Sequence, residues 1–293
     1  MDLSVVVVVF DMRREAPRTL YSLSRRHQRG LESTSYEIIV VENPSAAMLD
    51  AEQVHGLGEE FRYVPRSEVS SSPAAALNEG VESARAERVM LYVDGARLAS
   101  PGLLAASLRA ARLHADPVVA TLGWHLGPSP HQQAKATNYT REVEDELLQS
   151  SDWQRDGYGL FSVSCLSRSA RGGFAGPLPE STALLARRAT FDRIGGYDLR
   201  FRSAGGGLVN HDLFGRLLEE PTTELILLLD EGTFHQMHGG ATTGDETGAA
   251  LSWTAAHEEY VQIRGTPWTA MAAQPLLVGR LRTEVVPFLH ETL

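Results

Sequence analysis

Residues 3–10 read LSVVVVVF, an almost unbroken run of β-branched and other apolar side chains. Branching at Cβ favours strands, and successive side chains of a strand point to opposite faces of its sheet. A strand that is apolar on both faces needs cover on both, which is typical of a central strand in a parallel sheet flanked by helices. Because Asp11 ends the run, it is too short to cross a membrane. The run therefore predicts an α/β fold.

The rest of the first hundred residues alternates between strand and helix patterns. The order is β-α-β-β-α-β-α, which is typical of a nucleotide-binding fold with a mostly parallel sheet. Further strands are expected at residues 36–42, 61–64 and 88–94, and helices from about residue 17, over 73–86 and over 101–113.

The second half of the chain is less regular. We expect residues 1–250 to form one domain, with a nucleotide-binding half over 1–100 and an acceptor and catalytic half over 101–250. The tail over 251–293 looks helical, apart from Pro267 and Pro275, and is expected to be a C-terminal helical appendage. The expected strands are 118–123, 160–167 and 224–229, and the expected helices are 141–148, 187–194 and 212–220.

Composition and charge exclude several classes of protein. Lys and Arg number 27 against 37 Asp and Glu, and the net charge of -10 would repel a phosphate backbone, so no nucleic-acid partner is expected. Cys165 is the single cysteine, which excludes a disulfide framework or a cysteine-rich zinc site. Asp2 stands where a signal peptide would be basic, and we expect a cytoplasmic protein. Lys135 is the one lysine and follows no glycine-rich loop, which excludes a Walker-type phosphate loop.

Two acidic residues, Glu42 and Asp94, end predicted strands. Ligands of open α/β sheets bind at the carboxyl ends of the strands. Acids there can contact the base or ribose of a nucleotide, or hold a cation beside its diphosphate. The alternative is that both are solvated acids before turns, and the two residues alone leave that open.

The segments VVVVVF, YEIIVVENPS, PAAALNEG and RVMLYVDGARLASPGLL, in this order, resemble the N-terminal half of family-2 inverting glycosyltransferases. GGYDLRF at 195–201, HDLFGRL at 211–217 and HQMHGG at 235–240 extend the likeness, which spans Leu3 to Gly240. The resemblance implies the GT-A fold, a Rossmann-like mixed sheet flanked by helices. It also implies transfer of a sugar from a nucleoside-diphosphate sugar to an acceptor hydroxyl.

The same resemblance assigns the donor site. Glu42 matches the acid that contacts the nucleobase, and Asn78 lies in the segment that matches the family's alanine-asparagine-glycine helix. Asp94-Gly95-Ala96 lies where the family has its D-x-D metal motif. The residues expected to bind the nucleotide sugar are Val9, Phe10, Glu42, Asn78, Asp94 and Gly95.

Ala96 departs from this motif, because the family has an aspartate at its third position. We expect a divalent cation, Mn²⁺ or Mg²⁺, held by Asp94 and His238, since His238 resembles the late metal ligand of several GT-A enzymes. With one carboxylate the affinity for free metal should be low, so the cation should bind together with the donor. His235 is expected to be structural. A metal-independent or inactive protein stays open.

Asp212 matches the acid that acts as general base, with His211 in place of the preceding glutamate. Arg216 lies one helical turn further on the same face, where it can keep the carboxylate ionised. Without the resemblance, a helix-capping aspartate with an ion pair is the simpler interpretation. The residues expected to contact the acceptor or support the base are Trp124, Glu180, His211 and Arg216, with Trp124 and Glu180 in loops at strand ends.

The sequence therefore favours a metal-assisted inverting glycosyltransferase, with a role in polysaccharide biosynthesis and a saccharide or other hydroxyl acceptor. A homodimer and a peripheral membrane contact stay open. The alternative is a degenerate GT-A module that binds nucleotide or a partner protein without turnover, for which Ala96 is the best support. A sugar-nucleotide nucleotidyltransferase is disfavoured, because residues 10–16 (FDMRREA) contain neither glycine nor lysine.

Overall fold

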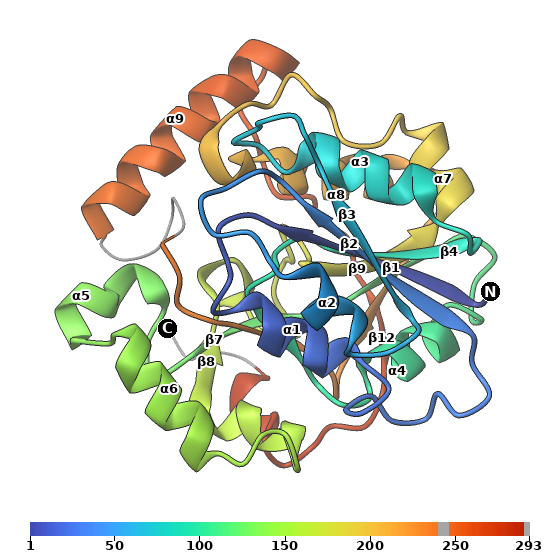
Figure 1. The fold of residues 1–293 in the computed structure, drawn as a ribbon. Helices are drawn as coiled ribbons and strands as arrows, with labels where there is room; N and C mark the ends of the chain where they lie inside the picture. The colour runs from blue at the N-terminus through green and yellow to red at the C-terminus, as the bar shows by residue number, and fades with distance from the viewer. Residues whose placement is uncertain (240–245, 290–293) are drawn as a thin grey trace.

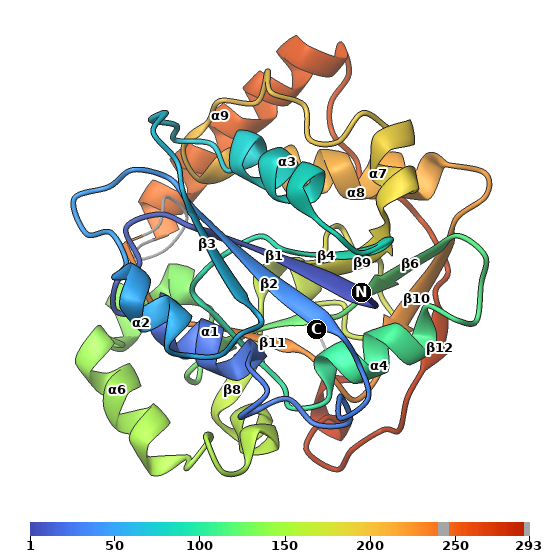
Figure 2. The same ribbon diagram turned by 45° about the vertical axis from the view of Figure 1, so that its right-hand side comes forward.

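A large sheet runs through the middle of the molecule, with helices on both faces (Figures 1 and 2). The computed structural model of the protein describes residues 1–239 and 246–289. In this sheet β9 is antiparallel to its neighbours β4 and β6, whereas the other pairs are parallel. The strands in spatial order are β12 (Leu276–Val278), β10 (Glu224–Leu228), β6 (Pro117–Ala120), β9 (Ala183–Arg187), β4 (Arg88–Tyr92), β1 (Leu3–Val9), β2 (Tyr36–Glu42) and β3 (Phe61–Pro65).

The central strand β1 explains the two-faced apolar run of the sequence. All seven of its residues are buried, and its valines divide between two cores, with Val6 and Val8 on one face and Val5, Val7 and Val9 on the other. The first face is covered by α3 (Ala74–Ser83), α7 (Arg188–Arg193) and α8 (Val209–Glu219), and the second by α1 (Ala16–Leu23), α2 (Ala51–His55) and α4 (Leu103–Ala110).

A second, smaller sheet brings together four segments that are far apart in the sequence. Its central strand β11 is antiparallel to β5 and parallel to β7, and β7 is antiparallel to β8. These strands, in spatial order, are β5 (Arg97–Ala99), β11 (Thr233–His235), β7 (Gly123–Leu126) and β8 (Ser164–Leu166). Because β5 follows β4 closely, this sheet lies beside the carboxyl end of the main one.

The remaining helices lie outside both sheets. Figure 1 shows α9 and the pair α5 and α6 at the periphery of the molecule, on the side away from the N-terminus. None of the helices among the described residues has the length and apolar character needed to cross a bilayer. The bounds are α5 (Ala134–Thr137), α6 (Arg141–Ser150), α9 (Glu246–Arg264) and the 3₁₀ helices η1 (His131–Gln133), η2 (Gly157–Val163), η3 (Arg168–Ala170), η4 (Ala204–Gly206) and η5 (Val286–Phe288).

The predicted fold class, a mixed α/β sheet flanked by helices, is confirmed, but two predicted elements are wrong. Most of residues 160–167 is not a strand, since η2 continues to Val163 and its Phe161 packs edge-on against Trp124. The C-terminal tail is not only helical, because Leu276–Val278 forms β12 and pairs with the outer edge of β10. Nothing local in that segment signals the pairing, which depends on an open sheet edge elsewhere in the chain.

Candidate active site

The carboxyl ends of β4, β1 and β2 lie next to one another, so the predicted donor residues fall along one edge of the sheet. Val9 and Glu42 are register partners, and Phe10, directly after β1, is 44% exposed. Gly95 packs tightly on the end of β1, since an added Cβ would come within 2.9 Å of Val9 Cγ2. This edge is where open α/β sheets bind ligands.

Glu42 is fully buried at the end of β2, and its carboxylate already has protein partners. The hydroxyl of Tyr63 donates to it at 2.6 Å, and the backbone N–H of Leu49 lies 3.1–3.2 Å from its two oxygens. Burial raises the pKa of Glu42 above its ordinary value, although these hydrogen bonds act in the opposite direction. Glu42 therefore fixes the loop between β2 and α2 against β3.

The side chain of Asn78 on α3 makes a two-way amide contact with the backbone of Tyr197. Its Nδ2 donates to the carbonyl of Tyr197 at 2.9 Å, and its Oδ1 accepts the N–H of Tyr197 at 2.8 Å. The structure thus uses this predicted donor-binding residue to hold the segment after α7 against α3.

The carboxylate of Asp94 meets two histidines, one at the end of β11 and one just after it. Its Oδ2 is 3.0 Å from Nε2 of His235 and 3.8 Å from Nε2 of His238, and the two Nε2 atoms are 3.0 Å apart. Burial would raise the pKa of Asp94, but the two histidines hold it well below its ordinary value, so the carboxylate stays ionised. The structure brings together Asp94 and His238, the predicted metal ligands, and adds His235.

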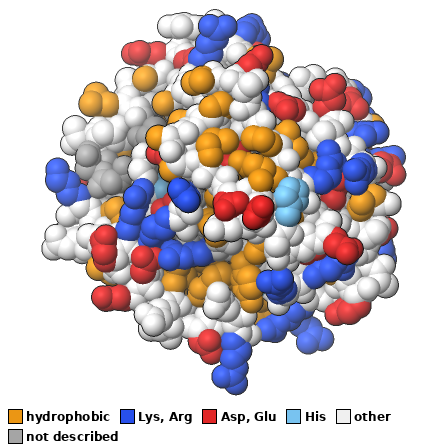
Figure 3. Space-filling model, in the orientation of Figure 1, with side chains coloured by type: hydrophobic (Ala, Val, Ile, Leu, Met, Phe, Trp, Pro, Cys, Tyr) orange, Lys and Arg blue, Asp and Glu red, His pale blue; other side chains and the backbone are white. Residues whose placement is uncertain are grey.

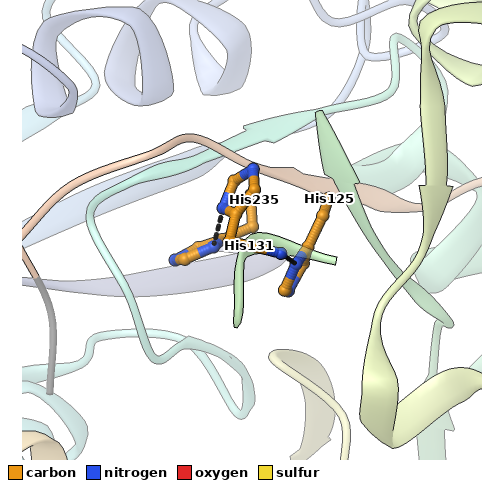
Figure 4. Close-up of side chains that lie close together, drawn as sticks. All are labelled: His125, His131 and His235. Carbon is orange, nitrogen blue, oxygen red and sulfur yellow. Dashed lines mark hydrogen bonds between the residues drawn. The ribbon is translucent and has the colours of Figure 1, made fainter. Parts of the chain in front are cut away.

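Three buried histidines lie side by side behind this carboxylate: His125 of β7, His131 of η1 and His235 of β11 (Figure 4). Nε2 of His131 lies 2.9 Å from the carbonyl oxygen of Leu126, and its Nδ1 lies 3.2 Å from Nδ1 of His235. The backbone N–H of His131 donates to Nδ1 of His125 at 2.8 Å. Burial lowers the pKa of His131 to about 4 and that of His235 well below its usual value, so both rings are neutral at neutral pH.

These contacts determine which nitrogens carry protons. A carbonyl oxygen can only accept, so neutral His131 carries its proton on Nε2 and accepts at Nδ1. His235 then donates from Nδ1, which leaves a lone pair on its Nε2 facing Asp94. Burial lowers the pKa of His238, but its contacts with Asp94 raise the net pKa above the ordinary value, so this spot favours a positive charge. One carboxylate oxygen and two imidazole nitrogens converge here, and such a donor set fits a divalent cation.

Asp212 lies in the first turn of α8, and two arginines occupy its carboxylate. Nε of Arg216 is 2.8 Å from Oδ2, and Arg264 of α9 donates to Oδ1 at 2.6 Å and to Oδ2 at 2.8 Å. Arg216 also donates to the carbonyls of Ile194 and Gly196. The side chain of Asp212 is 1% exposed. The predicted pair with Arg216 is present, and Arg264 adds a second one from the C-terminal part of the chain.

Glu180, in the loop before β9, is half-buried beside two residues of α8. Its Oε2 accepts from Nδ2 of Asn210 at 2.7 Å and lies 3.7 Å from Nδ1 of His211. Burial would raise the pKa of Glu180, but His211 and the Asn210 amide lower it below its ordinary value. Glu180 and Arg97 line the same small cavity, and Nε of Arg97 is 3.6 Å from Oδ2 of Asp94. Glu180 thus belongs to the same polar region as Asp94.

The prediction that Trp124 meets the acceptor from a loop is wrong. Trp124 lies inside β7, is 0% exposed, and packs against Phe161 and Phe234 with ring centroids 4.8 and 5.9 Å away. Pairing of β7 with both β8 and β11 turns this side chain into the core. The ring of Trp124 also packs directly on Gly232, where an added Cβ would come within 2.1 Å of it.

The family model described as glycosyltransferase like family 2 matches residues 6–225, from β1 into β10. The chain belongs to this family. The match contains Glu42, Asp94, Glu180 and Asp212 and ends before His235. No curated protein sequence matches the chain.

The family-2 chain shares its fold with solved structures of S. aureus TarS. The TarS structure is 12% identical, with a TM-score of 0.53 over 94% of this chain and 41% of TarS, so the chain spans less than half of that protein. TarS 1–349 in complex with UDP-GlcNAc is 14% identical, with a TM-score of 0.54 over 94% of this chain and 68% of the other. TarS 1–349 in complex with UDP gives a TM-score of 0.53 at 14% identity. At these identities the likeness concerns the fold.

In this family-2 chain, sequence reasoning assigned no role in the site to His235 or Arg264, and Arg97 was a candidate only for the charge on the leaving group if no metal binds. His235 looked like a buried strand residue, and only the pairing of β11 with β5 shows that its ring reaches Asp94. Arg97 was visible three residues after Asp94, a spacing that signals a local pair. Arg264 had no signal, since 52 residues separate it from Asp212. Gly240, the last residue of the HQMHGG segment, lies outside the described residues.

Proposed function

We propose that the protein is an inverting glycosyltransferase that moves a sugar from a nucleoside-diphosphate sugar to an acceptor hydroxyl. The observation that carries this proposal is the meeting of Asp94, His235 and His238 at the carboxyl edge of a family-2 sheet. A diphosphate leaving group needs positive charge beside it, and this cluster attracts positive charge.

A UDP-sugar is the first donor to test, because structures with the same fold hold UDP and UDP-GlcNAc. Exposed Phe10 and the loop held by Glu42 form the place for the base in this proposal. Although the chain has a net charge of -10, basic side chains gather to the left of centre on the face shown in Figure 3. Such a cluster favours an anionic donor.

Asp94 and His238 would hold the cation, which would supply charge to stabilise the departing diphosphate. Arg97 lies beside Asp94 with its Nε 3.6 Å from the carboxylate, and it would orient Asp94 from the protein side. The other steps of the reaction fall to the side chains, which position the donor and remove a proton from the acceptor hydroxyl.

Inversion in a single displacement needs one general base, and we propose a carboxylate at the start of α8 for this role. Asp212 is the residue that the family resemblance assigns, and in the proposal Arg264 leaves its carboxylate when the acceptor enters. Glu180 is the second candidate, supported by the cavity that it shares with Arg97. Either group would need to reach the acceptor oxygen at hydrogen-bonding distance.

Aromatic side chains beside these carboxylates support a saccharide acceptor. The ring of His211 packs edge-on against Trp253 of α9 and Trp268, with centroids 5.7 and 5.0 Å away. Trp253 is 44% exposed and so offers a ring face at the surface. Binding sites for organic ligands commonly combine aromatic walls with a few polar groups.

Thermal unfolding with nucleoside diphosphates tests the proposal. At about one hundred times its dissociation constant, UDP should stabilise the protein by about 2.7 kcal/mol. GDP at the same concentration serves as the control for nucleobase choice, and release of UDP from UDP-sugars with saccharide acceptors measures turnover. No stabilisation by any nucleoside diphosphate would contradict the proposal, whereas binding without turnover would favour the degenerate module.

A further inference from the structure

Ala96 leaves the donor site with one carboxylate, and the fold places a histidine where a further ligand is needed. Ala96 is 0% exposed, so its side chain faces the protein interior. Its N–H donates to Oδ1 of Asp94 at 2.8 Å, and its carbonyl accepts the N–H of Gln236 at 2.7 Å. The second bond ties the end of β11 to the Asp94 turn. It thereby brings His235 and His238, on either side of Gln236, to the other oxygen of Asp94, Oδ2.

We propose that Asp94, His235 and His238 form a two-histidine, one-carboxylate centre that binds a divalent transition-metal ion before the donor arrives. The proposal adds His235 as a metal ligand at the proposed donor site. It rests on the proposed function only for the position of this centre beside the donor. Its basis is the converging geometry: Oδ2 of Asp94 and both Nε2 atoms are 3.0, 3.0 and 3.8 Å apart. Ligands with bonds of about 2.1 Å, set at right angles on one ion, are about 3 Å apart.

The orientation of His235 is fixed by a chain of hydrogen bonds typical of a metal ligand. Its Nδ1 lies 3.2 Å from Nδ1 of His131, whose Nε2 donates to the carbonyl of Leu126 at 2.9 Å. Ligating histidines almost always donate their other ring N–H to a fixed acceptor, which sets the tautomer and makes the ligand more basic. The chain leaves Nε2 of His235 as the atom that faces Asp94.

A second group of histidines, His125, His131 and His235, also lies close together, but its nitrogens are already used. Nδ1 of His125 accepts the backbone N–H of His131, and both ring nitrogens of His131 have partners. Figure 4 shows these contacts within the trio. Within the trio, His131 orients His235, whereas the Nδ1 of His125 is occupied by a backbone N–H, so the trio does not form a second centre.

The ligand set determines which ions bind. Mg²⁺ prefers oxygen ligands, whereas imidazole ligands bind transition-metal ions, with an affinity that rises from Mn²⁺ to Co²⁺ and Zn²⁺. With one carboxylate and His238 alone, the cation was expected to arrive with the donor. A third ligand from His235 makes binding to the protein alone favourable, and Co²⁺ should bind at least about tenfold more tightly than Mg²⁺.

Binding of Co²⁺ to the full chain without nucleotide tests the centre. Calorimetry gives the affinity, and the visible absorption of bound Co²⁺ reports nitrogen ligands. His238→Gln should weaken binding at least about tenfold, while His125→Gln, a buried histidine of the neighbouring trio, should change it less than about threefold. Asp94→Asn provides a second ligand variant if His238→Gln does not fold, as judged by circular dichroism without metal.

Two outcomes would overturn the proposal. One is wild-type affinity for Co²⁺ no higher than that for Mg²⁺. The other is a loss of Co²⁺ binding in His125→Gln as large as in His238→Gln, which would place any metal in the trio. Binding of UDP, measured on the same samples in EDTA, tests the proposed function separately. If the protein binds UDP but fails to bind Co²⁺, the metal centre is refuted and the proposed function stands.

Discussion

Asp212 and Glu180 can be separated by substitutions that remove the basic oxygen and keep the shape of the side chain. We expect Asp212→Asn to lower kcat about 10²- to 10⁴-fold, because an amide cannot take the acceptor proton. Glu180→Gln is the matched variant and should retain most of the rate. Release of UDP from the donor, measured over a range of acceptor concentrations, gives kcat and KM for both.

The reverse pattern would contradict the assignment. If Glu180→Gln loses the rate while Asp212→Asn keeps more than half of it, the base is Glu180, and the Asp212 carboxylate serves only as the partner of Arg216 and Arg264. Donor affinity that falls together with the rate in Asp212→Asn would also indicate a structural role, because a base acts after the donor has bound.

Glu42 gives a second prediction at the scale of single residues. Glu42→Ala should weaken binding of UDP by about 1–3 kcal/mol, because it leaves the N–H of Leu49 and the hydroxyl of Tyr63 without their buried acceptor and loosens the loop of the proposed base site. Tyr63→Phe is the control, since it removes the 2.6 Å hydrogen bond to Glu42 and leaves the carboxylate in place. Calorimetry with UDP checks both. Unchanged UDP affinity in Glu42→Ala would contradict the role of the loop, and a smaller loss in Tyr63→Phe would show that the bond to Leu49 contributes separately.

Among the elements, α9 is attached to the rest of the molecule by apolar side chains such as Ala256 and also by polar contacts. Arg264, in its last turn, pairs with Asp212 of α8 and with Asp198. Glu259 accepts the backbone N–H groups of Arg202 and Ser203 at 2.7 and 2.9 Å. The helix thus closes the loop after α7 over the start of α8, which is where the acceptor is proposed to bind.

Removing Arg264 should therefore loosen α9. We expect Arg264→Gln to lower the free energy of unfolding by about 1–3 kcal/mol, less than for a fully buried pair because Arg264 is partly exposed. Arg200 pairs with the same Asp198 but is largely exposed, so Arg200→Gln should cost clearly less than Arg264→Gln. Urea unfolding of both variants measures the difference. Equal losses of unfolding free energy would contradict the role of Arg264 in holding α9 to α8.

At the scale of the whole molecule, buried histidines should make stability depend on pH. Burial lowers the pKa of His27 from 6.5 to about 4, and its ring packs against Tyr21 and Trp153. The unfolded chain binds a proton near pH 6.5, whereas the folded protein does so only near pH 4. Stability is therefore full above about pH 6.5 and is lost as the pH falls toward 4.

Replacing this ring by one that cannot be protonated tests the sign. His27→Phe should remove up to about 3 kcal/mol of the loss between pH 7 and pH 4, while ring packing is retained. Free energies of unfolding in urea, measured at several pH values for wild type and variant, give the two slopes. Parallel curves would show that His27 does not contribute to acid sensitivity.

The sequence by itself determined the elements whose signals are local. The valine run predicted β1 as a central strand, and 36–42 matches β2 residue for residue with Glu42 as its last residue. The strand predicted over 88–94 is β4, which ends at Tyr92, so Asp94 lies two residues beyond it. Periodicity and turn residues act over a few positions, so they can be recognised without knowing the fold. For the same reason the pair of Asp212 and Arg216, one helical turn apart, was predictable.

Only the tertiary structure decided which distant residues meet. The ring of His235 reaches Asp94 because β11 pairs with β5, Arg264 reaches Asp212 because α9 returns to α8, and Trp124 is core because β7 has neighbours on both sides. These contacts join segments separated by about 40 to more than 130 residues. Their formation depends on strand order and open sheet edges, properties of the assembled sheet that no short window of sequence contains.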